Sequence, residues 1–143
     1  MKFAMSNRRD TQNYGLLIPS YHDETNSLIL EIPRNHRNVV EQFQIDDISS
    51  DFEYSLTHPQ ARRYGIDFSA VDHLSAAFLD ELIAFRSGVA IKQGHDPRSV
   101  PPQDRVGLIG VDNQIKETFV ITRLDKIMTF YDSRAGFLAA ARP

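Results

Sequence analysis

Apolar runs of strand length, separated by helical patterns, most constrain what this chain can fold into. Arg105–Val111 is a nearly continuous apolar run, which is typical of a parallel strand buried on both faces. Gly65–Phe68 predicts a second strand and Ile127–Tyr131 a last short one. Helical spacing fills the segments between them, so strand and helix alternate from residue 65 onward. This alternation predicts a mostly parallel sheet with right-handed crossovers.

The helices of this second half are predicted from capping residues and from apolar spacing. Ser75 precedes a helix over Ala76–Arg86, Asp112 or Asn113 caps the next one, and Ser133 caps the last. Each helix has residues at 3–4 spacing that are expected to face inward. These are Leu79, Leu82, Ile83 and Arg86 in the first helix, Ile115, Phe119, Val120 and Ile121 in the second, and Phe137, Leu138 and Ala141 in the last.

The first half has weaker patterns. Ser27–Ile32 predicts a strand, Tyr14–Ile18 an earlier short strand, and Val39–Ile45 a third, less regular one. A helix is expected to begin after Asp46–Asp47 and to end at Pro59. These strands would add an antiparallel edge to the sheet. We therefore expect residues 1–26 to form a tail or an extra strand, and residues 27–143 to form one domain.

Composition excludes several classes of protein. With 143 residues and 41% apolar residues, the chain can bury the core of one domain. Its net charge is −3 and its basic residues are scattered, which argues against nucleic-acid binding. It has no apolar run long enough for a membrane span, no signal-peptide pattern and no cysteine. We expect a cytoplasmic domain without disulfides.

No pattern in the sequence predicts catalysis, a metal or a cofactor. Asp72, His73 and Ser75 are neighbours on one predicted loop, whereas a catalytic triad needs groups that converge from separate elements. The histidines lack metal-ligand spacing. Gly107 and Gly110 belong to no phosphate-loop motif, so close packing between strand and helix explains them better. We expect a protein that is not an enzyme.

Four short segments, in order, carry a resemblance to a known family. They are Ile66–Ala77, which contains Asp-Phe-Ser-Ala-Val-Asp-His-Leu, then Val106–Val111, Ile121–Ile127 with Thr-Arg-Leu-Asp-Lys, and Phe130–Ser133 with Tyr-Asp-Ser. In this order and spacing they resemble the STAS domain of the anti-sigma factor antagonists. The resemblance covers residues 64–140 well and 27–60 in outline. It implies an α/β fold in which a mostly parallel central sheet has an antiparallel N-terminal edge and helices packed on it.

The resemblance also implies a docking site. In the family, the loop after the middle strand binds an anti-sigma factor or serine-kinase-like partner, and a partner kinase phosphorylates a serine of an Asp-Ser-Ser-Gly motif. Here Ser75 occupies the aspartate position, Ala76 that of the phosphorylated serine, Ala77 that of the second serine and Phe78 that of the glycine. The usual phosphate acceptor is therefore missing. The implied partner-binding residues are Asp72, His73, Ser75, Ala76, Ala77 and Phe78.

Two of these residues have alternative interpretations. Ser75 either accepts a phosphate one position early or only caps the helix by accepting the amide of Ala77 or Phe78. Phe78 precedes the core-facing Leu79, so it either points outward as a docking anchor or packs under the next loop.

Three functions remain open at this level. The first is a regulator similar to an anti-sigma factor antagonist, which lacks the standard acceptor and binds its partner constitutively. The second is a non-phosphorylated STAS accessory subunit of a transport complex of the ATP-binding-cassette type or of a sensory scaffold. The third and weakest is a nucleotide-binding STAS domain.

Overall fold

A computed structural model describes residues 13–36, 38–39, 41–98 and 105–141. Its central sheet has the strand order β1-β2-β4-β6-β7. Strands β2 (Ser27–Glu31), β4 (Arg63–Asp67), β6 (Val106–Ile109) and β7 (Met128–Tyr131) are parallel. β1 (Ile18–His22) pairs antiparallel with β2 at the edge. The predicted parallel sheet with an antiparallel N-terminal edge is therefore confirmed.

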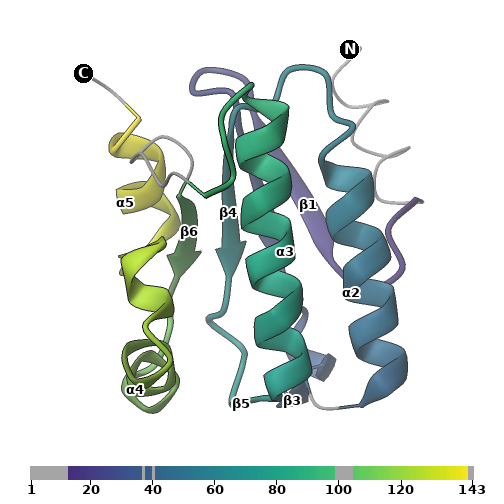
Figure 1. Cartoon of the computed structure of the whole chain (residues 1–143), viewed down its shortest axis with the longest axis vertical. Helices are drawn as coiled ribbons and strands as arrows, with labels where there is room; N and C mark the ends of the chain where they lie inside the picture. The colour runs from purple at the N-terminus through teal and green to yellow at the C-terminus, as the bar shows by residue number, and fades with distance from the viewer. Residues whose placement is uncertain (1–12, 37, 40, 99–104, 142–143) are drawn as a thin grey trace.

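The helices cover the two faces of the sheet unequally. Helices α2 (Gln42–Ser55) and α3 (Ala76–Lys92) lie side by side in front of the sheet (Figure 1). Buried side chains of α2, α3 and α4 (Asn113–Ile121) belong to the main core cluster. Short α5 (Arg134–Ala139) contributes to a separate cluster with β2 and β6. Consecutive residues of β2 and β6 are buried. Since adjacent strand residues point to opposite faces, the sheet is covered on both faces there.

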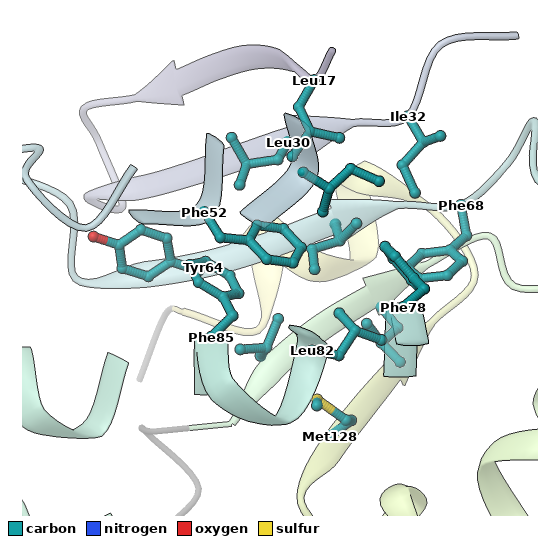
Figure 2. Packing of buried hydrophobic residues seen from close by; sticks show 14 of the residues in the cluster. Leu17, Leu30, Ile32, Phe52, Tyr64, Phe68, Phe78, Leu82, Phe85 and Met128 are labelled. Carbon is teal, nitrogen blue, oxygen red and sulfur yellow. The ribbon is translucent and has the colours of Figure 1, made fainter. Parts of the chain in front are cut away.

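The main core is rich in aromatic rings. The Phe52 ring of α2 stacks on Phe85 of α3 with 4.3 Å between centroids, and Tyr64 of β4 meets Phe85 edge to face at 5.4 Å. Figure 2 shows these rings gathered between the sheet and α3, beside Leu30 and Leu82. Aromatic pairs of this kind stabilise a core by more than their buried area alone. They hold α2 and α3 against β4, the strand that leads to the predicted docking loop.

Glycines of the sheet allow α5 to approach closely, as expected for Gly107. A β-carbon at Gly107 would lie 2.6 Å from the Phe137 ring, and one at Gly65 would lie 2.9 Å from it. The same expectation is wrong for Gly110, where a β-carbon would meet Ser69 rather than a helix. Gly110 has a φ of 69°, a left-handed conformation that glycine adopts without strain. The glycines thus serve packing and chain direction.

The first half of the chain differs from its predicted boundaries. The expected strand over Val39–Ile45 is wrong beyond Val39, because β3 (Asn38–Val39) is short and α2 already begins at Gln42. The Gln44 side chain accepts the amide of Glu41 at 3.0 Å, which caps the helix before the predicted start. The first strand lies at Ile18–His22 rather than Tyr14–Ile18. Of the predicted tail or extra strand over residues 1–26, residues 1–12 lie outside the described residues.

Asp51 of α2 explains the displaced first strand. Its carboxylate accepts the amides of Gly15, Leu16 and Leu17 at 2.7–2.8 Å. These amides cannot also join a sheet ladder, so pairing with β2 begins only at Ile18.

The second half follows its predicted elements, with some changes of length and face. Asp112 caps α4 and Ser133 caps α5, as expected. α3 continues to Lys92, beyond the predicted end at Arg86. Three residues expected to face the core are exposed instead, namely Ile83, Val120 and Ile121.

Candidate functional site

The candidate site begins where β4 leaves the sheet. Phe68 and Val71 are buried, and the amide of Val71 donates to the carbonyl of Phe68 at 2.9 Å. The Asp67 carboxylate accepts the amide of Ser69 at 2.9 Å and the guanidinium of Arg134 at 2.7 Å. Burial raises the pKa of Asp67, but the hydrogen bonds from Ser69 and Arg134 outweigh it and hold this pKa below its ordinary value. The loop therefore leaves the sheet from a fixed, ionised anchor.

A two-stranded parallel sheet holds the next segment. β5 (His73–Leu74) pairs with β3, and the amide of Ser75 donates to the carbonyl of Val39 at 3.1 Å. His73 Nδ1 and Asn38 Oδ1 lie within hydrogen-bond distance at 3.0 Å. The side chains of Asp72 and His73 are exposed. The backbone is thus fixed while these side chains face solvent.

The amino end of α3 completes this surface. Ser75 Oγ accepts the amide of Phe78 at 3.2 Å, so the predicted capping role is confirmed. Ala76 is exposed, and Ser75 and Ala77 are partly exposed. Residues Asp72 to Ala77 together form what we call the 72–77 surface. Asp72, His73 and Ala76 are its exposed residues, and the other three are partly exposed.

Phe78 is buried, so its interpretation as an exposed docking anchor is wrong. Its side chain is 0% exposed and meets the Phe68 ring edge to face, with 5.9 Å between centroids. It also lies 6.5 Å from the Phe52 ring, and Figure 2 shows it within the core. The buried arc of α3 is wide and includes Phe78 as well as Leu79 and Leu82. Phe78 therefore orients the start of α3 from beneath.

A hollow of about 220 Å³ lies beside the 72–77 surface. Asp72, His73 and Leu74 line one side, and residues of α4 line the other. We call it the α3–α4 hollow, because residues 72–74 lead into α3; its α4 residues are Gln114, Ile115 and Thr118. Sequence reasoning missed these three residues. A signal existed, since β4 and β6 are parallel and the segments after their carboxyl ends emerge at the same edge of the sheet.

Asp72, His73 and Ser75 do not form a catalytic triad. The His73 ring contacts Asn38, and the Ser75 hydroxyl accepts a backbone amide instead of facing an imidazole. Among the described residues, no group of three or more metal-ligating side chains is present. None of the helices in the described ranges is long and apolar enough to span a membrane. The geometry is that of an exposed, rigidly held surface.

Comparison with solved structures identifies the fold. An anti-sigma factor antagonist (STAS) domain protein from Planctomyces limnophilus matches with a TM-score of 0.69 and 17% identity, over 87% of this chain and 97% of that one. The chain has a STAS-like fold. A candidate anti-sigma factor antagonist from Thermotoga maritima, TM1081, matches with a TM-score of 0.70 and 13% identity, over 92% of this chain and 99% of that one. An NMR structure of TM1081 gives 0.65 and 14%, over 90% of each chain.

The sequence comparisons add no further relative. No protein-family profile matches the chain, and no curated protein sequence matches it significantly. Identities of 13–17% show the STAS fold alone. The predicted resemblance is thus confirmed for the fold, and the partner of the 72–77 surface is a matter for proposal.

Proposed function

We propose that this chain is a regulatory protein-binding module of the anti-sigma factor antagonist type. It docks an anti-sigma factor or serine-kinase-like protein through the 72–77 surface, with Asp72, His73, Ser75, Ala76 and Ala77 in contact. The observation that carries this proposal is the exposed yet fixed amino end of α3 within a STAS-like fold.

Rigidity of the 72–77 surface favours docking. Its backbone is held at Asp67, at β3 and at the Ser75 cap, and Phe78 anchors it in the core. A surface that is already ordered loses little conformational entropy on binding, so more of the contact energy remains as affinity. The buried core below it also keeps substitutions on the surface from disturbing the fold.

The missing phosphate acceptor at Ala76 excludes regulation of partner binding by phosphorylation at this position. Ala76 has no hydroxyl, so phosphorylation at this position cannot release the partner. We propose Ser75 as the residue to examine for modification, because its side chain is partly exposed at the helix start. A phosphate there would add a charge of about −2 near unpaired backbone amides. Incubation with the partner kinase and phosphate mapping by mass spectrometry tests this; modification elsewhere, or none, would exclude Ser75.

The experiment is affinity capture from the source cells with the wild-type chain and two variants. Ala76→Glu places a carboxylate on the 72–77 surface, while Ala84→Glu makes the same change on an exposed position of α3 about 12 Å further along the helix. We expect mass spectrometry to identify an anti-sigma factor or serine-kinase-like protein with the wild type and with Ala84→Glu. We expect Ala76→Glu to lose it.

The same capture distinguishes the alternative function. Ala76 is also compatible with a non-phosphorylated accessory subunit. Recovery of an ATPase subunit of a transport complex would replace the proposed function by that one. Recovery of the same partner by Ala76→Glu as by the wild type, with both folded, would refute docking through the 72–77 surface.

A further inference from the structure

Two exposed isoleucines extend the site beyond the 72–77 surface. Ile83 of α3 is 39% exposed and Ile121 of α4 is 79% exposed. Exposed large apolar side chains that gather on one face of a protein mark interaction sites. Ile121 stands on α4, which lines the α3–α4 hollow, and Ile83 stands seven residues along α3 from Ala76 of the 72–77 surface.

Helical spacing connects Ile121 with the hollow. Gln114, Thr118 and Ile121 stand at i, i+4 and i+7, so they form one stripe along α4. The first two line the α3–α4 hollow, and Ile121 follows them on the same side. The stripe therefore runs from a polar, recessed start to an exposed apolar end.

α3 presents a matching stripe. Ala76, Asp80, Ile83 and Ser87 stand at i, i+4, i+7 and i+11, which gives a line from the 72–77 surface that contains one acidic and one large apolar side chain. Between Ala76 and Ser87 the line is about 17 Å long. A partner helix of about three turns would match this length. The absence of a long side chain at Ala76 leaves room for its approach at the start of the line.

Charge selects the chemistry of the partner. Asp72, Asp80, Asp112 and Glu117 are exposed around the two stripes. The basic residues of the same segments, residues 72–87 and 112–121, are occupied elsewhere. Arg86 is buried and donates to the carbonyl of Pro97, and Lys116 lies over the Phe130 ring at 5.2 Å from its centroid. Within these two segments the exposed carboxylates form what we call the acidic rim, while the exposed Arg123 lies beyond Ile121.

We propose that the α3–α4 hollow and the two stripes, together called the groove, bind a basic amphipathic helix of the partner protein. One apolar side chain of that helix enters the hollow, others contact Ile83 and Ile121, and its lysines or arginines face the acidic rim. This inference rests on the proposed function and deepens it by naming the partner's binding element. A second copy of this chain fits less well, because two acidic rims would face each other and repel.

The test uses a defined probe, a fluorescein-labelled helical peptide of about 12 residues. It has leucines at i, i+4 and i+7 and lysines on the flanking positions; a control peptide has glutamates in place of the lysines. Fluorescence polarisation measures binding to the full chain and to two variants. Ile121→Asp changes the groove, and Val120→Asp changes the neighbouring residue, which is also exposed at 54% but lies about 100° around α4.

We expect the basic peptide to bind, Ile121→Asp to weaken it about 30-fold, and Val120→Asp to change it less than about twofold. High salt should weaken binding and the acidic peptide should not bind. No binding of the basic peptide, or equal loss in both variants, would overturn the inference. So would a dimer in sedimentation that Ile121→Asp dissolves, since it would make a second copy the occupant.

The outcomes separate this inference from the proposed function. If the captured partner is lost with Ala76→Glu and retained with Ile121→Asp, the docking module stands and the helix groove is wrong. If the peptide binds the groove but capture yields no anti-sigma or kinase-like protein, the groove stands and the proposed function is wrong.

Discussion

Replacement of Phe78 by alanine is expected to destabilise the fold rather than to remove a surface contact. The ring is fully buried and makes two aromatic contacts, with Phe68 and Phe52. Phe68 in turn meets Phe119 of α4 at 6.1 Å, so the ring belongs to a chain that connects β4, α3 and α4. Its removal leaves a cavity at the point where the 72–77 surface joins the core.

The size of this effect follows from burial. Truncation of a buried phenylalanine to alanine costs about 3–5 kcal/mol of unfolding free energy, through lost burial and an unfilled cavity. Domains of this kind have a stability of about 5–15 kcal/mol, so a weakened but folded variant is expected at low temperature. This cost is about three to five times that of losing the Ser75 cap, which is about 1 kcal/mol.

Urea denaturation followed by far-UV circular dichroism measures this difference. The chain has no tryptophan, so tyrosine fluorescence supplies the second probe of unfolding. Val120→Ala is the control, because Val120 is exposed and its truncation should change stability by less than about 0.5 kcal/mol. A loss below about 1 kcal/mol for Phe78→Ala would refute the buried position and restore the surface-anchor interpretation.

Two further perturbations test features around the site. Asp51→Asn should cost about 2–4 kcal/mol in urea denaturation, because three backbone amides lose a charged acceptor, and a loss under about 0.5 kcal/mol would contradict this. Burial, with a smaller contribution from Arg62, lowers the pKa of Lys92 to about 8. Above pH 8 the Lys92 side chain of the native state has therefore lost its proton, whereas in the unfolded chain it keeps this proton up to its ordinary pKa of 10.5. Stability should therefore rise with pH between about 8 and 9.5, before the raised pKa of Tyr64 opposes it, and Lys92→Met should flatten the rise. An identical pH profile in that variant would show that Lys92 is not its source.

The second half of the fold could be predicted because local signals agree with each other there. The apolar run at β6 requires burial on both faces, and it is buried. Ser75, Asp112 and Ser133 are side chains that favour helix starts, and each of them accepts a backbone amide at one. Where propensity, pattern and capping indicate the same element, tertiary contacts have little to override.

The first half was harder because its boundaries depend on contacts distant in sequence. Leu16 and Leu17 have strand-like character, but their amides bind Asp51, which lies 35 and 34 residues further along the chain, respectively. Val39 lies in a strand, yet Gln44 caps the helix that follows almost at once. A Glu-x-x-Gln pair is a weaker sign of a helix start than the serine or threonine form of the capping box.

The location of the candidate site could be predicted from the sequence, but only some of its residues could. The loop after β4 follows from the order of strand and helix, and the 72–77 surface is exposed as the docking hypothesis requires. Phe78 was ambiguous because one helical turn cannot show how wide the buried arc of α3 is. Gln114 and Thr118 join the α3–α4 hollow only through packing of α4 beside β5, which no local pattern reports.

Hydrogen exchange measured by mass spectrometry, on the chain alone and bound to its captured partner, tests most directly where this protein docks. Binding is expected to slow exchange in peptides that cover residues 70–80 and 112–121, and to leave β1 and α5 unchanged. Protection that appears only at β1, α5 or the α2 side, with residues 70–80 exchanging as in the free chain, would contradict docking at the amino end of α3.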